Sequence, residues 1–338
     1  MATVIDYLVC SARQHPNKAA FSDTEHSVTY AELLTTAKSV ASAIIGKTQK
    51  VNAPVVVFID RNVESICAFM GIAMSRNFYV PIDTTQPIQR IQTIVNQMQP
   101  IAVISIGNVP EGVVLGDIPI LEYSELIDTD VDEMLIGSVR RYCMDTDPLY
   151  AICTSGSTGV PKGVLISHRS VMDFIPVFCE TFSFDSDEIF GNQAPFDFDV
   201  SVKDIYSTLY CGASMYIIPR VCFSMPKMLI SHLNERKVTT IIWAVSALCI
   251  VAGVNAFKSG VPQYLKKVMF SGEVMPVKML NIWRSYLPDA MFVNLYGPTE
   301  ITCNCLYYII DREFANTDKL PLGVPFKNRN VMILDEQD

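Results

Sequence analysis

The chain has 338 residues, of which 50% are hydrophobic and 18% are charged, and its formal net charge is −9. This length suffices for a large core or for two to three compact units, and the low charged fraction indicates that much of the chain is buried. The negative charge, together with the lack of a lysine or arginine cluster in the sequence, argues against a nucleic-acid-binding surface.

The cysteines and histidines predict neither a metal centre nor a secreted protein. The ten cysteines include no Cys-x-x-Cys pair and the four histidines are far apart, so we expect no structural zinc site. Dispersed cysteines are typical of the reducing cytosol, and the N-terminus lacks the basic region and apolar core of a secretory signal. These features predict a cytoplasmic location.

Helices and strands alternate along most of the chain. Thr29 and Glu32 have the spacing of a capping box, and the apolar residues behind them predict an amphipathic helix. The segment 107–147 is less regular and more acidic, and we interpret it as a connection between two halves. Strands are expected at 54–60, 79–82, 101–106, 149–153, near 189, 215–218, 239–245, near 268 and 291–296, and helices at 63–74, 86–97, from about 170, from 202, 225–236, from 246 and 276–286.

The expected strands are apolar runs, a pattern typical of sheets that helices cover on both faces. The predicted architecture is therefore α/β, and the length favours two such sheets. Residues 238–257 carry no charge and are long enough to span a bilayer. Because polar residues interrupt this run, we expect instead a buried strand followed by a core helix that Ser246 caps.

The stretch from Tyr150 to Gly163 is the most informative part of the chain. An apolar strand ends at Cys153, and hydroxyl-bearing residues, glycines and a Pro-Lys-Gly triplet follow. Glycines let backbone N–H groups approach an anion closely, so the loop suits a polyphosphate, although it matches neither G-x-x-x-x-G-K-[ST] nor G-x-G-x-x-G. A flexible linker is the alternative, but linkers seldom carry Pro-Lys-Gly between apolar segments. The candidate phosphate-binding residues are Thr154, Ser155, Gly156, Ser157, Thr158, Gly159 and Lys162.

Three further polar segments follow expected strands. The first, 192–206, carries Asp197 and Asp199 among aromatic residues just before a helix, where N-capping is an alternative role for a carboxylate. The others are 271–273, which reads Ser-Gly-Glu, and 294–300, which reads Asn-Leu-Tyr-Gly-Pro-Thr-Glu. In open α/β sheets ligands gather at the edge where strands pass into loops, so we expect these segments to meet there.

The segment 154–163 together with Tyr296-Gly-Pro-Thr-Glu300 resembles the adenylate-forming superfamily. Its members are adenylation domains of nonribosomal peptide synthetases, acyl-CoA synthetases and luciferases. The ordered pair of motifs is very specific, and 192–196 and 271–276 are most similar to D-alanine–carrier protein ligases and their peptide-synthetase relatives. Early motifs of the amino-acid branch also match at 28–33 and 79–83, and the segment that follows matches at 321–325 and 331–335, so that the resemblance covers essentially the whole chain.

This resemblance implies two stacked αβαβα subdomains, one at about 50–185 and the other at 1–49 plus 186–310, with the beginning of a small β-barrel at 311–338. The implied reaction is attack of an amino-acid carboxylate on the α-phosphate of ATP, which gives an aminoacyl-adenylate and pyrophosphate. The phosphopantetheine thiol of a carrier protein then takes the acyl group. The mobile C-terminal subdomain of the superfamily, with its catalytic lysine, has no counterpart in these 338 residues. The implied unit is therefore the N-terminal core of a ligase, incomplete without that subdomain as its partner, and Lys162 is not that lysine.

The resemblance also implies roles for the nucleotide-binding residues. The loop would hold the β- and γ-phosphates of ATP, Thr299 would touch the α-phosphate, and Glu300 would hold Mg²⁺, a hard cation that prefers oxygen ligands. The implied catalytic residues are Thr158, Lys162, Thr299 and Glu300. The adenine site would consist of Gly272, Glu273, Asn294, Tyr296 and Gly297, with Asn294 bonded to the adenine amino group and Tyr296 stacked on the ring.

Asp199 is the position that discriminates between substrates, because amino-acid-activating members pair it with the substrate ammonium and fatty-acid or aryl-acid enzymes do not need it. Lys203 departs from the apolar or aromatic residue often found at its place: it either pairs with an acidic or polar side chain of the substrate or snorkels from a helix toward water. Ser271 replaces the cysteine that D-alanine ligases often carry. The remaining pocket implied by motif position is Val200, Lys203, Trp243 or a residue near it, Met269, Ser271, Leu295, Cys303 and Asn304.

Two other functions remain open. An acyl- or aryl-CoA synthetase core would activate its acid without Asp199. A non-catalytic nucleotide-binding or interaction module would keep the fold without the chemistry.

Overall fold

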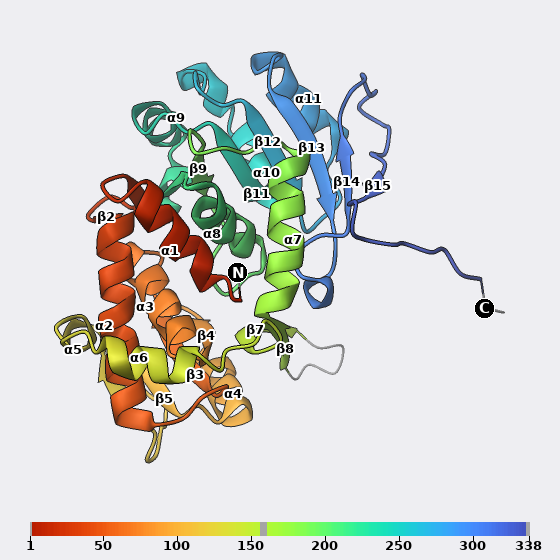
Figure 1. The fold of residues 1–338 in the computed structure, drawn as a ribbon. Coiled ribbons are helices and arrows are strands. Elements are labelled where there is room, and N and C mark those ends of the chain that lie inside the picture. The colour runs from red at the N-terminus through yellow and green to blue at the C-terminus, as the bar shows by residue number, and fades with distance from the viewer. Residues whose placement is uncertain (1, 156–160, 336–338) are drawn as a thin grey trace.

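The computed structural model describes residues 2–155 and 161–335, in which the strands form two sheets (Figure 1). One sheet has six strands in the order β6-β5-β3-β4-β7-β8, and its ladders are parallel except for the antiparallel pair β7–β8. Its strands are β3 (Pro54–Ile59), β4 (Phe78–Asp83), β5 (Ala102–Ser105), β6 (Ile120–Glu122), β7 (Pro148–Ser155) and β8 (Pro161–Ser167).

The other sheet has nine strands in the order β15-β14-β13-β12-β11-β9-β10-β1-β2. The ladders from β1 to β13 are parallel, and β2, β14 and β15 add antiparallel strands at the two edges. Its strands are β1 (Ala19–Ser22), β2 (Ser27–Thr29), β9 (Ile189–Asn192), β10 (Ser214–Ile217), β11 (Thr240–Ala244), β12 (Lys267–Ser271), β13 (Met291–Tyr296), β14 (Leu306–Ile309) and β15 (Val324–Pro325).

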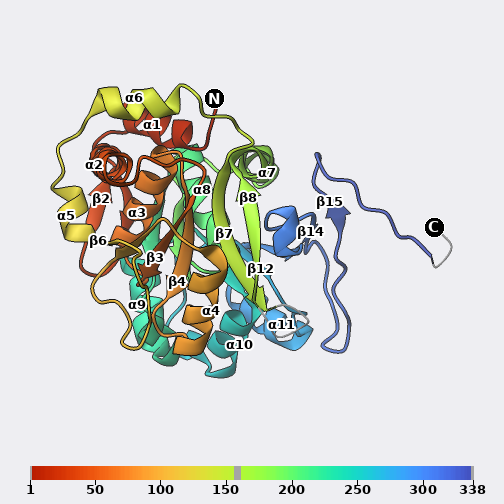
Figure 2. The ribbon, with the colours of Figure 1, turned by 90° about the horizontal axis from the view of Figure 1, so that it is seen from below.

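Helices lie between the two sheets and on their outer faces. The central layer shares one buried core with both sheets and consists of α1 (Ile5–Gln14), α2 (Tyr30–Thr48), α3 (Val63–Met74), α7 (His168–Thr181) and α8 (Val200–Cys211). The six-stranded sheet packs its outer face on α4 (Ile88–Met98), as Figure 2 shows. The nine-stranded sheet packs its outer face on α9 (Pro226–Glu235), α10 (Val245–Gly253) and α11 (Val277–Tyr286). The short helices are α5 (Tyr123–Ile127), α6 (Glu133–Arg140), η1 (Arg220–Ser224), η2 (Ala256–Ser259) and η3 (Thr299–Ile301).

The apolar runs in the sequence have their explanation in this layering. Side chains alternate between the faces of a strand, so in β3 Val55 and Val57 point into the central core while Val56 and Phe58 pack against α4. Because both faces of the strand are buried, the side chains on each face must be apolar. The α/β architecture with two covered sheets is thereby confirmed.

Several local predictions are confirmed and two are wrong. The helix at 63–74 has the predicted bounds, and Thr29 caps α2 through a complete capping box with Glu32. Ser246 does not cap α10, because that helix begins one residue earlier and its N-cap, Ala244, makes no side-chain bond. The segment 107–147 is more than a connection, since β6 extends the six-stranded sheet and α5 and α6 lie against α2.

The uncharged run at 238–257 forms β11 and α10, as expected. Among the described residues, no helix combines the length and the apolar character that crossing a membrane requires. The cytoplasmic location and the subdomain boundaries, including a barrel at 311–338, stay predictions. The last described residues are exposed and lead away from the body of the protein (Figure 1).

Candidate functional site

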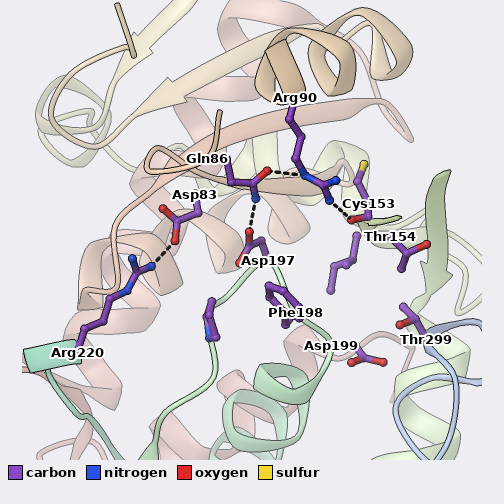
Figure 3. Close-up of a pocket in the computed structure, with 12 residues that line it drawn as sticks. Asp83, Gln86, Arg90, Cys153, Thr154, Asp197, Phe198, Asp199, Arg220 and Thr299 are labelled. Atoms are coloured by element: carbon purple, nitrogen blue, oxygen red, sulfur yellow. Dashed lines mark hydrogen bonds and ion pairs between the residues drawn. The ribbon is translucent and has the colours of Figure 1, made fainter. Parts of the chain in front are cut away.

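A cavity of about 580 Å³ lies where strands of both sheets end (Figure 3). Its walls come from residues at or beyond the carboxyl ends of β4, β7, β9, β10 and β13, the edge at which parallel sheets collect ligands. The lining residues are Asp83, Gln86, Arg90, Ile152, Cys153, Thr154, Pro195, Asp197, Phe198, Asp199, Arg220 and Thr299. Three predicted residues from three separate segments, Thr154, Asp199 and Thr299, therefore border one cavity.

The predicted phosphate loop connects the two strands of a hairpin. Gly156, Ser157, Thr158 and Gly159 lie outside the described residues, but the strands on either side of them are described. Thr154 on β7 stands opposite Lys162 on β8 in the antiparallel register, and its Oγ1 donates to the Lys162 carbonyl at 3.5 Å. Lys162 itself is exposed, and β8 lies alongside η3, which carries Thr299 and Glu300. The described strand β8 of this hairpin therefore lies next to the second motif.

Asp199 is partly buried at the start of α8. Burial raises the pKa of its carboxyl group above the usual value, and the charge of Glu300 acts in the same direction. The charge of Lys203 and a hydrogen bond with Thr299 oppose that rise in the pKa. A carboxylate that burial makes costly to ionise gains most from a cationic ligand, which fits a site for an ammonium group.

The N-capping alternative is wrong for Asp199, which occupies the N-cap position of α8 but makes no side-chain cap bond. Asp197 makes no cap bond either and instead points to the opposite wall of the cavity, where Gln86 Nε2 donates to its Oδ2 at 2.5 Å (Figure 3). Its Oδ1 is buried without a partner. Burial and the neighbouring charge of Asp83 raise the pKa of Asp197.

A second cavity, of about 380 Å³, lies beyond the ends of β12 and β13. Its lining includes all five residues predicted for the adenine site, Gly272, Glu273, Asn294, Tyr296 and Gly297. Asn294 donates its amide Nδ2 to the Pro321 carbonyl at 2.9 Å, which leaves Oδ1 as the acceptor that an exocyclic amino group requires. Tyr296 is 47% exposed and lines this cavity, so its ring is accessible to a stacking ligand. These residues fit a purine.

Position 297 requires glycine because the backbone at 303–305 passes very close to it. A Cβ atom on Gly297 would lie 2.5 Å from the Asn304 Cα and 2.7 Å from the Cys303 carbonyl oxygen. The neighbouring residues Thr302 and Cys303 both adopt left-handed backbone conformations, with φ of 66° and 69°. This strained turn brings Cys303 to Asp199, so that the Cys303 thiol donates to the Asp199 carbonyl at 3.3 Å.

Lys203 lies deep in the protein, one helical turn after Asp199 on α8, and only 1% of its surface is exposed. Its Nζ donates to Asn304 Oδ1 at 2.8 Å and lies 3.5 Å from Ser271 Oγ. Since the ammonium group points inward to two predicted pocket residues, the snorkelling interpretation is wrong.

The remaining predicted pocket residues divide between the two faces of the nine-stranded sheet. Met269, Leu295 and Cys303 belong to the central core together with α8, and Val200 is partly buried on α8 itself. Trp243 is a correction, because the alternation along β11 places it on the outer face, where it packs on Phe223 and Trp283. Its indole donates to the Gly191 carbonyl at 2.7 Å, so its role is structural.

Four lining residues with charged or amide side chains were not predicted as site residues from the sequence: Asp83, Gln86, Arg90 and Arg220. Arg90 links the two sides of the cavity by donating to Gln86 Oε1 at 2.8 Å and to the Cys153 carbonyl at 3.2 Å. Arg220 forms an ion pair with Asp83. Burial alone would raise the pKa of Asp83, but hydrogen bonds from Thr85 and Arg220 hold it below its usual value. The position of Asp83 at the end of a strand was the available signal, whereas the isolated arginines gave none.

The oxygen-bearing side chains around the first cavity also fit Mg²⁺ and the phosphates of ATP, the ligands that the motifs imply. Glu300 is an exposed carboxylate on η3, close enough for its charge to act on Asp199, and it is the kind of hard oxygen ligand that Mg²⁺ prefers. Thr154 and Thr299 place hydroxyl groups at the same cavity, where phosphate oxygens accept hydrogen bonds.

Comparisons with known proteins agree with this geometry. The D-alanine–D-alanyl carrier protein ligase of Lactiplantibacillus plantarum is 30% identical over 99% of the chain, and that of Streptococcus agalactiae serotype III is 32% identical over 91%. The chain spans 65% and 60% of the length of these relatives.

Two solved structures share the fold. The nonribosomal peptide synthetase FmoA3 in its form bound to α-methyl-L-serine-AMP superposes with a TM-score of 0.88 at 22% identity, over 99% of this chain and 37% of that one. VinN superposes with a TM-score of 0.83 at 19% identity, over 100% of this chain and 85% of that one. A family model described as AMP-binding enzyme matches residues 9–338. The chain therefore belongs to the family of AMP-binding enzymes, as its two motifs predicted.

Proposed function

We propose that the chain is the nucleotide- and substrate-binding core of a ligase that activates an amino acid with ATP and passes it to a carrier protein. The observation that carries the proposal is that Thr154, Thr299 and Asp199, from three segments far apart in the sequence, border one cavity. One aminoacyl-adenylate in this cavity would meet Thr154 at the start of the phosphate loop, Thr299 at its α-phosphate and Asp199 at its ammonium group. The relatives named D-alanine–D-alanyl carrier protein ligase support an amino-acid substrate and a carrier protein as partners.

In this proposal the substrate carboxylate oxygen bonds to the α-phosphorus of ATP, and the bond from that phosphorus to the pyrophosphate oxygen breaks. Thr154 and Lys162, with Ser155, Gly156, Ser157, Thr158 and Gly159, hold the departing phosphates. Thr299 donates to the α-phosphate. Bound Mg²⁺ would neutralise phosphate charge, and Glu300 is the residue that would hold it. The protein contributes positioning and charge stabilisation, which dominate this class of reaction.

The purine would lie in the second cavity, between Tyr296 and the Gly272–Glu273 backbone, with its amino group donating to Asn294 Oδ1. Asp199 would hold the ammonium group of the amino acid. The predicted pocket then continues over Val200, Lys203, Met269, Ser271, Leu295, Cys303 and Asn304, without Trp243.

Asp199→Asn tests the proposal. A nonhydrolysable alanyl-sulfamoyladenosine and AMP are titrated into the wild type and the variant by calorimetry, with ATP–pyrophosphate exchange as the activity measurement. A charge-assisted hydrogen bond contributes about 1.5–3 kcal/mol, so the variant should bind the aminoacyl analogue about 10- to 150-fold more weakly. AMP affinity should stay unchanged, and Asp289→Asn, an exposed position remote from both cavities, should change neither.

Two outcomes would contradict the proposal in different ways. If Asp199→Asn binds the aminoacyl analogue as tightly as the wild type does, the substrate is not held by its ammonium group and an acyl- or aryl-acid activating core becomes the better assignment. If neither AMP nor the analogue binds, the nucleotide assignment itself fails.

A further inference from the structure

Lys203 is a fully buried cation with neutral partners. Its ammonium group contacts a side-chain amide oxygen, Asn304 Oδ1, and a hydroxyl oxygen, Ser271 Oγ. Throughout residues 2–155 and 161–335, no carboxylate forms an ion pair with Lys203, whereas the nearly buried Lys267 is paired with Glu188. Lysine is almost never fully buried unless it is paired, because desolvating an ammonium group is expensive. The position therefore lacks an anion.

The neighbouring carboxylates do not supply that anion once substrate is bound. Asp199 acts on Lys203 through its charge, but in the proposed function it becomes the partner of the substrate ammonium. Asp204 makes its hydrogen bond elsewhere, since its Oδ2 accepts from Asn192 Nδ2 at 2.7 Å, while its Oδ1 is buried without a partner. The charge of Lys203 does act on Asp204, but burial raises the pKa of Asp204 to about 7, so below that pH it is mostly protonated and does not neutralise Lys203. With substrate in place and Asp204 protonated, the ammonium groups of Lys203 and of the substrate face one ionised carboxylate, Asp199, so one positive charge is left over.

The spacing of the two charged residues defines the shape of the missing partner. Asp199 and Lys203 stand four residues apart at the start of α8, so they share a helix face with about 5–6 Å between their Cβ atoms. A ligand whose ammonium group meets Asp199 would need a second, anionic group at a similar distance to meet Lys203. The α-carboxylate cannot serve, because it must reach the α-phosphate beside Thr299. A side-chain carboxylate one or two methylene groups from the α-carbon has this geometry.

We propose that the amino acid activated at this site carries a side-chain carboxylate, as aspartate and glutamate do, and that Lys203 is its recognition group, with Asn304 and Ser271 orienting the ammonium. The inference rests on the proposed function, because it assigns Asp199 to the substrate ammonium. It makes Lys203 a specificity-determining residue.

The test compares AMP by calorimetry with three nonhydrolysable analogues, the aspartyl, glutamyl and alanyl sulfamoyladenosines, each in its L and D forms. The wild type should bind at least one acidic ligand about 10- to 150-fold more tightly than the alanyl ligand, the range of a charge-assisted hydrogen bond. Lys203→Met should abolish that preference while AMP affinity stays the same. Lys258→Met, at an exposed lysine on η2, should leave the preference intact.

The variant has a second readout that does not depend on ligands. Replacing a buried, unpaired ammonium by an apolar group of similar length is expected to leave the melting temperature unchanged or to raise it. If Lys203→Met fails to fold, the comparison among ligands on the wild type still decides the matter.

The outcomes separate the two proposals. If the alanyl ligand binds as tightly as the acidic ligands, or if Lys203→Met keeps the acidic preference, the inference about the side chain is wrong while the proposed function stands. If no aminoacyl ligand binds more tightly than AMP, the proposed function fails and this inference with it.

Discussion

Asp204 is fully buried on α8, and its ionisation should make the stability of the protein depend on pH in a measurable way. Burial raises the pKa of its carboxyl group to about 7 from the ordinary value of 3.8, although a hydrogen bond from Asn192 and the charges of Lys203 and Arg61 oppose that rise. Between these two pH values the folded protein holds a proton that the unfolded chain has lost. Stability therefore falls as the pH rises from about 4 through about 7.

The size of the effect follows from the shift in the pKa of Asp204. Each pKa unit corresponds to about 1.4 kcal/mol, so a rise from 3.8 to about 7 destabilises the folded state by about 4 kcal/mol once Asp204 is ionised. Asp204→Asn cannot ionise, and its side-chain oxygen can still accept the bond from Asn192. Any cost of the amide itself is the same at every pH.

Urea unfolding of the wild type and of Asp204→Asn across about pH 4 to about pH 8 isolates this term, because all other titrating groups are common to both proteins. As the pH rises over this range, the difference in the free energy of unfolding, variant minus wild type, should increase by up to about 4 kcal/mol. Parallel curves, with a constant difference between the two proteins, would show that Asp204 ionises as freely in the folded state as in the unfolded chain and would refute the reasoning.

Three further predictions concern other parts of the fold. Burial lowers the pKa of His168 to about 4, and the charge of Asp147 opposes this shift. The free energy of unfolding should therefore fall by up to about 3 kcal/mol as the pH drops from about 6.5 to about 4. In urea unfolding, His168→Gln should not show this fall. Gly297→Ala forces a Cβ against backbone and should lower the free energy of unfolding by about 1–3 kcal/mol and weaken AMP binding in calorimetry. Gly253→Ala, with open space around it, is the matched control and should do neither, and equal behaviour of the two alanine variants would contradict the close approach. Thr29→Ala removes the N-cap of α2 and should cost about 1 kcal/mol in urea unfolding, whereas an unchanged midpoint would mean that the capping box contributes nothing.

The elements that the sequence predicted well are those that local chemistry determines. The capping box at Thr29 and the helix at 63–74 could be predicted without the tertiary structure, because residues close together in the sequence determine both. The two motifs at 154–163 and 296–300 were equally local, and they led to the correct family.

What could not be predicted depends on distant parts of the chain. β8 is exposed over much of its length and carries glycine and lysine, so only its pairing with β7 makes it a strand. The face to which Trp243 points is set by the register of β11 between its neighbours, not by the residue itself. Arg220 enters the cavity because β10 lies in the same sheet as β9, and the sequence gives no sign of that neighbour relation.

Lys203 shows the same limit at the level of one side chain. From the sequence, a lysine near the start of a helix is as compatible with a solvated surface as with a pocket. The difference is decided by Asn304, about a hundred positions later, whose amide oxygen lies 2.8 Å from the ammonium group.

The two consecutive left-handed residues, Thr302 and Cys303, have a consequence for how this protein can change over time. Such conformations cost about 1–3 kcal/mol each in residues other than glycine, and a glycine would remove that cost. Selection for thermal stability alone would therefore favour glycine at Thr302, and the freed backbone would let the Asn304 amide move away from the lysine that it orients. Variants that gain heat resistance at this turn should accordingly become less selective toward their substrates.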